Sequence, residues 1–149
     1  MPVITTDILL EGQRRDDVLE WLSKAENHAR LVEAAFTGVK ANGPGDWTVT
    51  FQAGLLPRTM GYRFERVDQE HGGRRVHVHT SGKRVDGTLH YSLRTMKPST
   101  NTLVTLHHDY SSGGPLGAML DASGIRAGLE KAWRSVLEQV KREVSASGG

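Results

Sequence analysis

The hydrophobic positions of this chain follow a period of two residues, then a helical period, then a period of two again. Residues 3–12, VITTDILLEG, combine β-branched and aliphatic side chains and end at Glu-Gly, which predicts a first strand. In residues 14–36 the apolar side chains recur at helical spacing, and a polar interruption near residues 24–27 predicts two short helices. The amino-terminal part is therefore expected to form one strand followed by a helix pair.

Six further strands are expected between residues 36 and 115, where apolar and polar side chains alternate and turn residues separate the segments. The segments are 36–45, 46–54, 57–73, 74–82, 83–101 and 102–115. Because their connections are short, successive strands should pair antiparallel as a meander. Residues 115–144 then predict one long amphipathic helix, which Ser123 and Gly124 could interrupt. Its apolar stripe consists of Ile125, Leu129, Trp133, Val136, Leu137, Val140 and Val144.

This order of elements predicts an α+β helix-grip fold. A curved seven-stranded antiparallel sheet, in the order β-α-α-β6-α, would wrap around the long C-terminal helix, because a twisted sheet buries an apolar helix most economically across its concave face. The length of 149 residues fits one domain. We assign residues 1–145 to that domain and residues 146–149 to a flexible tail, because the segment from Ser145 onwards, SASGG, is small and polar.

Composition excludes several classes of function. The chain has no cysteine, which removes disulfides, thiolate catalysis and Cys-ligated zinc. A net charge of +2 without clustered aromatic side chains does not favour nucleic-acid binding. No signal peptide or transmembrane run stands out, so we expect a soluble, cytoplasmic monomer or homodimer without a cofactor. Asp16 and Asp17 fit the first turn of a helix, and Ser123 lacks triad partners, so we assign them no catalysis.

Strand parity places four histidines on the outer face of the sheet. Val76 and Val78 alternate with His77 and His79, so burying the valines leaves these two imidazoles outside. The same rule gives an outer stripe of His77, His79, His90 and His107. Imidazoles on neighbouring strands could chelate zinc, but an outer face has no wall to enclose a substrate. We therefore interpret the stripe as solvated polar residues and predict no physiological metal.

The fifth histidine of this region, His108, has the opposite parity and should share the concave face with Tyr91, Tyr110 and Trp133. Three interpretations stay open for it: a core histidine bonded to Tyr91 or a backbone group, a group that orients the polar end of a ligand, or a general acid or base. A register slip of one residue would exchange His108 for His107.

Three stretches carry a resemblance to a known superfamily. Residues 87–120, GTLHYSLRTMKPSTNTLVTLHHDYSSGGPLGAML, are similar to the penultimate hairpin and the run into the last helix of the START/Bet v 1-like superfamily, also called SRPBCC or polyketide cyclase-like proteins. LEKAWRSVLEQVKREV resembles its final helix, and VLEWLSKAENHARLV resembles its short helix pair. The resemblance implies a hydrophobic tunnel between sheet and helix. Members carry lipids, sterols, quinones, plant hormones or polyketide intermediates, and some catalyse cyclisation, dehydration or ring hydroxylation.

The leading expectation is therefore the binding or transport of a hydrophobic or amphipathic small molecule, such as a lipid, quinone or polyketide-like compound. The candidate ligand-binding residues are Phe51, Met60, Tyr62, Phe64, Val78, Leu89, Tyr91, Leu106, His108, Tyr110, Met119, Ile125, Leu129 and Trp133. The same side chains could instead fill the interior as solid core.

Two alternatives belong to other classes of function. One is a cyclase or dehydratase that uses His108 and Tyr110 as catalytic residues, and the other is a partner-binding module that uses the outer stripe or Trp21. Arg58 and Arg63 are expected to be surface charges near a rim. Inside the last predicted helix, Gly124 and Gly128 suggest a kink or a close approach of ligand.

Overall fold

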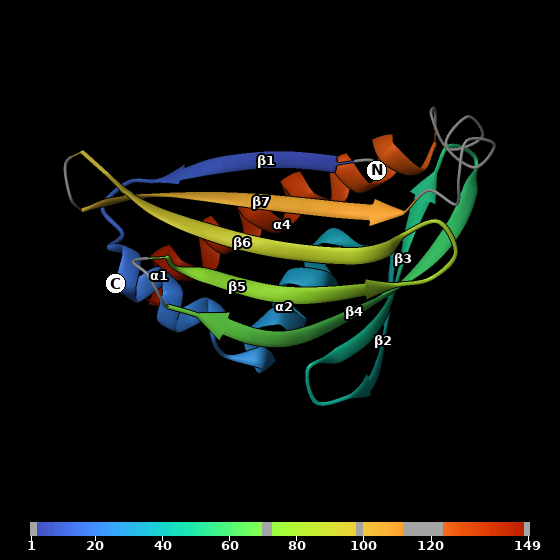
Figure 1. The fold of residues 1–149 in the computed structure, drawn as a ribbon, viewed down its shortest axis with the longest axis horizontal. Helices are drawn as coiled ribbons and strands as arrows, with labels where there is room; N and C mark the ends of the chain where they lie inside the picture. Colours follow the sequence, from blue (N-terminus) through green and yellow to red (C-terminus); the bar gives the residue numbers. More distant parts are fainter. Residues whose placement is uncertain (1–2, 70–72, 98–99, 112–123, 148–149) are drawn as a thin grey trace.

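The computed structural model describes residues 3–69, 73–97, 100–111 and 124–147. The predicted order of one strand, two short helices, six strands and a C-terminal helix is confirmed (Figure 1). The elements are β1 (Val3–Leu10), α1 (Arg15–Leu22), α2 (Ala25–Ala35), β2 (Gly38–Gly43), β3 (Asp46–Ala53), β4 (Leu56–Asp68), β5 (Arg75–Ser81), β6 (Asp86–Met96), β7 (Asn101–Ser111) and α4 (Ile125–Ser147).

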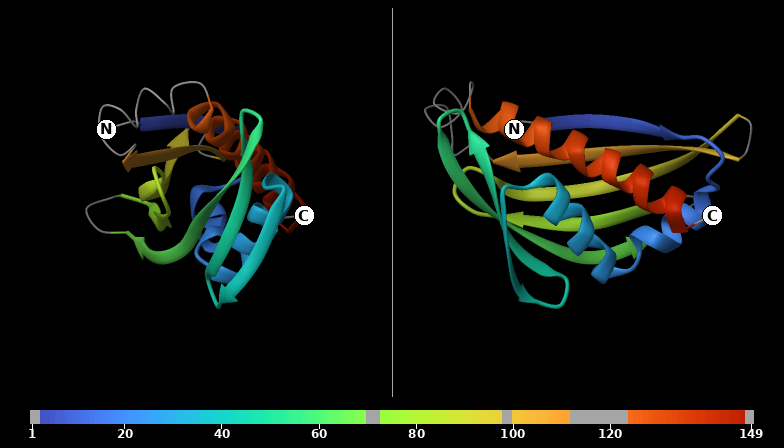
Figure 2. Two further views of the ribbon diagram at one scale, coloured as in Figure 1. Left: turned by 90° about the vertical axis from the view of Figure 1, so that its right-hand side faces the viewer. Right: turned by 180° about the vertical axis from the view of Figure 1, so that it is seen from behind.

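The seven strands form one antiparallel sheet in the order β1-β7-β6-β5-β4-β3-β2. Strands β2 to β7 follow each other as the predicted meander, and β1 completes the sheet by pairing with β7, with Val3 opposite Asp109. The sheet curls, and α4 crosses its concave side with α1 and α2 beside it (Figure 2). This is the predicted helix-grip arrangement.

A bulge in β4 keeps the polar and apolar faces of the sheet separate. The pairing with β5 shifts between Phe64 and Arg66, which adds one residue, Glu65, to β4. Because side chains alternate along a strand, an unbroken β4 would have turned Arg66 inward after Phe64. The extra residue places Val67 opposite the buried Val76 instead.

The break between the two short helices has a local cause. The Ser23 hydroxyl donates to the carbonyl oxygen of Leu19 at 2.6 Å, which satisfies a carbonyl at the end of α1. The Asn27 side chain, already inside α2, donates to the carbonyl oxygen of Trp21 at 2.8 Å. These bonds cap the end of α1 and connect it to the first turn of α2. The acidic residues Asp16 and Asp17 lie in the first turn of α1, as predicted.

Helix α4 supplies the largest buried side chain of the core, Trp133. Its predicted apolar stripe is buried from Ile125 to Val144. The described helix begins at Ile125, so the predicted helical residues 115–123 lie outside the described residues. At its other end α4 continues to Ser147, past the start of the predicted tail, because Ser and Ala can extend a helix that is anchored at Val144.

Gly128 in α4 approaches a strand, so the suggestion of a close approach of ligand is wrong for it; Gly124, predicted inside the helix, lies one residue before α4 and approaches the same strand. A methyl group at Gly128 would overlap the carbonyl oxygen of Gln52 in β3 and would come within 3.0 Å of the Phe51 ring. At Gly124 it would lie 3.3 Å from the carbonyl carbon of Ala53. These glycines therefore let the first turns of α4 rest directly on the backbone of β3. Among the described residues, no helix is long and apolar enough to cross a membrane.

Candidate functional site

A chain of hydrogen bonds crosses the concave interior from the sheet to α2. The Tyr91 hydroxyl lies 2.8 Å from the Tyr62 hydroxyl, and the Tyr62 hydroxyl lies 2.6 Å from Nδ1 of His28. The other ring nitrogen of His28, Nε2, lies 2.8 Å from the carbonyl oxygen of Leu22. All three side chains are fully buried. The chain thus connects β6, β4 and α2 beneath the sheet.

The direction of this chain follows from its last acceptor. A carbonyl oxygen can only accept, so Nε2 of His28 carries the hydrogen and Nδ1 is an acceptor. The Tyr62 hydroxyl therefore donates to His28, and its oxygen accepts from Tyr91. Tyr91 is the first donor of this hydrogen-bond chain, and its hydroxyl hydrogen is used in the bond to Tyr62. Within the described residues the Tyr91 oxygen receives no hydrogen bond, so it can accept one from a donor group.

Burial keeps each member of the chain uncharged at neutral pH. Desolvation lowers the pKa of His28 to about 4, against an opposing effect of its bond to the Leu22 carbonyl. Desolvation raises the pKa of Tyr62 well above its usual range, and the neighbouring Tyr91 adds to this. The pKa of Tyr91 is also raised, again mainly by burial. The Tyr91–Tyr62–His28 hydrogen-bond chain is therefore polar and uncharged, and it lies among the apolar side chains of the core.

His108 belongs to a second buried network. The indole N–H of Trp133 donates to Nδ1 of His108 at 3.1 Å, so Nε2 carries the hydrogen of the neutral ring. Nε2 lies 3.0 Å from the Thr80 hydroxyl oxygen, and that hydroxyl donates to the carbonyl oxygen of Val85 at 2.8 Å. Both ring nitrogens of His108 are thus occupied. Burial, with a smaller effect of His107, lowers the pKa of His108 to about 3.

The prediction that His108 lies on the inner face of the sheet is confirmed, and the predicted hydrogen-bond partner of its ring is wrong. His108 points inward and His107 outward, so the register did not slip. Its neighbours are Trp133 and Thr80 instead of Tyr91 or a backbone group, because Tyr91 is engaged by Tyr62. The ring of His108 also lies beside that of Tyr110, with 5.0 Å between centroids.

Aromatic side chains contact one another in the middle of the grip. The Trp133 ring lies 5.6 Å from Phe36, 6.4 Å from Tyr62 and 5.3 Å from His108, measured between centroids. Trp47 lies 6.0 Å from Tyr62 on the other side. These are contact distances for aromatic rings. Trp133 therefore belongs to the His108 network and also contacts Tyr62 of the other hydrogen-bond chain.

Most of the predicted ligand-binding residues are buried between the sheet and the helices. Met119 lies outside the described residues. Phe64 is half-buried, with its ring 5.2 Å from that of His28. The others are all buried: Phe51, Met60, Tyr62, Val78, Leu89, Tyr91, Leu106, His108, Tyr110, Ile125, Leu129 and Trp133. Arg63 is exposed and Arg58 half-buried.

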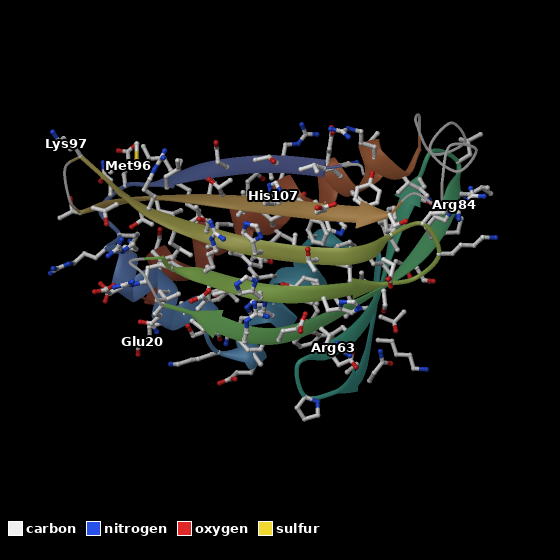
Figure 3. All side chains as sticks on the ribbon, viewed as in Figure 1. Glu20, Arg63, Arg84, Met96, Lys97 and His107 are labelled. Carbon is white, nitrogen blue, oxygen red and sulfur yellow. The ribbon has the colours of Figure 1, made fainter. Side chains whose placement is uncertain are left out.

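The outer stripe lies on the convex face, where Figure 3 shows His107 on the side of the sheet away from the helices. His77, His90 and His107 stand directly opposite one another on β5, β6 and β7. The rings of His90 and His107 stack at 5.0 Å, and Nδ1 of His107 lies 3.2 Å from the Thr5 hydroxyl. Desolvation and then His107 lower the pKa of His90 to about 4. In the described part of the chain, no group of three His, Asp or Glu side chains has the arrangement of a metal site.

Sequence reasoning missed two residues of the interior, although each had a signal. His28 lies at helical spacing from Leu31 and Val32, on the buried stripe of α2. Thr80 continues the inward parity of Val76 and Val78 along β5. Periodicity alone would have placed both side chains inside, where a buried polar side chain requires a hydrogen-bond partner.

A hollow of about 370 Å³ lies elsewhere, at the surface beside α1. Its walls are Asp16, Leu19, Glu20, Ser23, Lys24 and Gln69. None of these residues belongs to either buried network. The hollow is open and lined partly by charged side chains, so it does not match the apolar site that the sequence predicts.

Comparison with solved structures identifies the fold. Norcoclaurine synthase from Thalictrum flavum, a point mutant in complex with a transition-state analogue, matches with a TM-score of 0.70 and 18% identity over 99% of this chain and 96% of that chain. The Zhui aromatase/cyclase from Streptomyces sp. R1128 matches with a TM-score of 0.64 and 14% identity, over 97% and 93% of the two chains. XoxI from Bacillus cereus matches with a TM-score of 0.63 and 12% identity, over 100% and 99%.

No family model and no curated protein matches the sequence. The similarity to solved structures covers nearly the whole chain, so the chain has the Bet v 1-like helix-grip fold. At these identities the match shows the fold alone, and ligand and activity must be argued from the side chains.

Proposed function

We propose that this protein binds a hydrophobic or amphipathic small molecule between the concave face of its sheet and α4, and that the Tyr91 oxygen accepts a hydrogen bond from the polar end of that molecule. The Tyr91–Tyr62–His28 chain carries the proposal. Each hydrogen in the chain points toward the Leu22 carbonyl, which leaves one acceptor facing an apolar interior. A ligand with a hydroxyl or amine donor complements that acceptor.

The fold supports this proposal. Norcoclaurine synthase from Thalictrum flavum has also been solved in complex with dopamine and hydroxybenzaldehyde, with a TM-score of 0.68 and 16% identity to this chain over 97% of it and 87% of that chain. A protein with this fold therefore accommodates small molecules. At this identity the ligand of norcoclaurine synthase does not carry over to this protein, and the ligand depends on the side chains of the candidate site itself.

Magnitudes show why the polar contact matters. Burying roughly 300 Å² of apolar ligand surface contributes about 7 kcal/mol, and association costs about 4 kcal/mol or more. The remaining free energy corresponds to roughly millimolar affinity. A hydrogen bond contributes about 1 kcal/mol, or about fivefold in affinity. A single acceptor at Tyr91 therefore determines which of two ligands of equal shape binds better.

The protonation states favour binding over acid–base chemistry. The enzymatic alternative, a cyclase or dehydratase that uses His108 and Tyr110, needs a ring nitrogen of His108 to become free. Both nitrogens are hydrogen-bonded, and burial holds the pKa of His108 at about 3. A general acid or base works best with a pKa near the working pH. Turnover with a bell-shaped pH profile, abolished in His108→Ala, would establish the alternative.

A matched pair of ligands tests the proposal. 2-Naphthol carries a donor, and 2-methoxynaphthalene has nearly the same shape without it, so both are titrated while tryptophan fluorescence is recorded. We expect saturable binding of both, with 2-naphthol bound about fivefold more tightly, and loss of this preference in Tyr91→Phe. Ser92→Ala, next to Tyr91 but on the convex face, should keep the preference. No saturable binding, or an unchanged preference in Tyr91→Phe, would refute the proposal.

A further inference from the structure

The turn between β3 and β4 exposes two adjacent leucines. Leu55 is 98% exposed and Leu56 is 64% exposed. The third exposed large hydrophobic side chain of the described residues, Leu9, is only 38% exposed and lies at the far end of β1. Exposing two adjacent leucine side chains to water is unfavourable, so their presence in this turn is not explained by folding.

The geometry of the turn does not require leucine. Ala53 pairs with Leu56, so Gly54 and Leu55 form a two-residue hairpin loop. Gly54 has φ +67°, the conformation that such a loop needs at its first central position. The second central position is compatible with small polar residues, which would leave no apolar surface. A polar residue at position 55 would therefore support the same backbone conformation as Leu55.

Basic side chains occur in the same hairpin as the leucines and in the neighbouring β5–β6 turn. Arg58 follows Leu56 by two residues and so projects on the same side of β4. The β5–β6 turn adds Lys83 and Arg84, and its Gly82 lies against Thr59 and Met60 of β4 (for a methyl built on Gly82, 3.4 Å to the Thr59 oxygen). Figure 3 shows Arg84 at this end of the sheet.

Charge in these two turns is predominantly positive. Residues 53–59 and 81–87 contain three basic side chains, Arg58, Lys83 and Arg84, and one acidic side chain, Asp86. Apolar side chains projecting from a basic rim match the interface of a bilayer with anionic headgroups, where leucine enters the acyl boundary and basic groups contact phosphate.

We infer that the β3–β4 turn is a docking site for an anionic bilayer surface. The leucines Leu55 and Leu56 insert at the interface, and the basic rim selects membranes that contain acidic lipids. The turn lies beside the first residues of α4, because Gly124 contacts Ala53. Docking would therefore bring the junction of β3 and α4 to the membrane. The inference goes beyond ligand binding and does not depend on it.

Flotation of the full chain with vesicles tests this inference. The vesicles contain either phosphatidylcholine alone or phosphatidylcholine with about one third phosphatidylglycerol, a composition that supplies the negative surface potential. We expect flotation with the anionic vesicles and little with the neutral ones, and a decrease when salt rises from about 0.1 M to about 0.5 M. The double variant Leu55→Ser/Leu56→Ser should bind at least roughly tenfold more weakly. Leu9→Ser, the same change at the other end of the sheet, should bind like the parent chain.

Each other outcome overturns the inference. Absence of flotation, or equal flotation of parent and Leu55→Ser/Leu56→Ser, would exclude this turn as a membrane site. A dimer detected by light scattering that dissociates in the double variant, without flotation, would assign the leucines to a second copy of the chain. Because both leucines are exposed, the double variant should keep the parent melting temperature, which separates loss of docking from loss of fold. Naphthol titration without vesicles tests ligand binding separately.

Discussion

Lowering the pH from 7 to 4.5 should destabilise the fold through two buried imidazoles, His28 and His108. Their pKa values in the folded protein are about 4 and about 3, whereas an unfolded chain gives histidine a pKa of about 6.5. Since the folded-state values are lowered, the unfolded state binds more protons in this range. The stability is complete above pH 6.5 and decreases as the pH falls toward the folded-state pKa.

The loss is large compared with the stability of a domain. Between pH 6.5 and 4.5 each histidine lowers the free energy of unfolding by about 1.4 kcal/mol per pH unit. From pH 7 to 4.5 this gives about 2–3 kcal/mol for each ring and about 5 kcal/mol for both, against a total stability of about 5–15 kcal/mol. The half-buried His90 acts in the same direction, but solvent screens its contribution.

Urea unfolding, followed by tryptophan fluorescence at intervals from pH 7 to 4.5, measures this loss. His28→Gln removes one of the two buried rings and should reduce the slope against pH by about 1.4 kcal/mol per pH unit. Ser92→Ala on the convex face changes no titratable group, so it is the control and should keep the slope of the parent. A free energy of unfolding that stays constant down to pH 4.5, or equal slopes for His28→Gln and the parent, would refute the assignment of the buried neutral rings.

Two further predictions concern packing and the second network. Gly128→Ala should lower stability by about 1–3 kcal/mol, because the new methyl overlaps the Gln52 carbonyl, and thermal unfolding will measure the decrease. Thr80→Val keeps the shape of the side chain but leaves the N–H of His108 without its acceptor. We expect a loss of about 1–3 kcal/mol in urea unfolding, together with a shifted nitrogen resonance of the His108 ring.

Exposed positions supply the controls for both variants. Ala127→Gly exchanges the same two residue types in the opposite direction on the exposed side of α4 and should cost about 1 kcal/mol from helix propensity alone. If Gly128→Ala stabilises the protein, as propensity alone would predict, the close contact with β3 is wrong. Thr88→Val on the convex face should be nearly neutral, and a similar cost at Thr88 and Thr80 would contradict a specific role for the buried hydroxyl.

The faces of the sheet could be predicted because alternation in β5, β6 and β7 is unbroken. Val76, Leu89 and Val104 all face inward as predicted, and the imidazoles between such positions face outward. The bulge at Glu65 could not be predicted in this way, because it is defined only by the pairing of β4 with β5. Period-two reasoning continued through that residue would have buried Arg66.

Hydrogen-bond partners were the part of the candidate site that the sequence did not reveal. Face and burial depend on local periodicity, whereas the partner of His108 depends on which strand and which helix lie opposite it. Trp133 comes from α4 and Thr80 from β5, and no local pattern relates these residues to His108. The same holds for His28, whose partner Tyr62 lies 34 residues away.

The pairing of β1 with β7 has a consequence for how the chain folds. Asp109, the neighbour of Val3 in the sheet, is made more than a hundred residues after Val3. At roughly 5–20 residues per second, the first strand waits on the order of 5–20 s on the ribosome before its partner exists. The hairpins from β2 to β6 involve near neighbours and can form during that interval, so β1 can join the sheet only after β7 has been made.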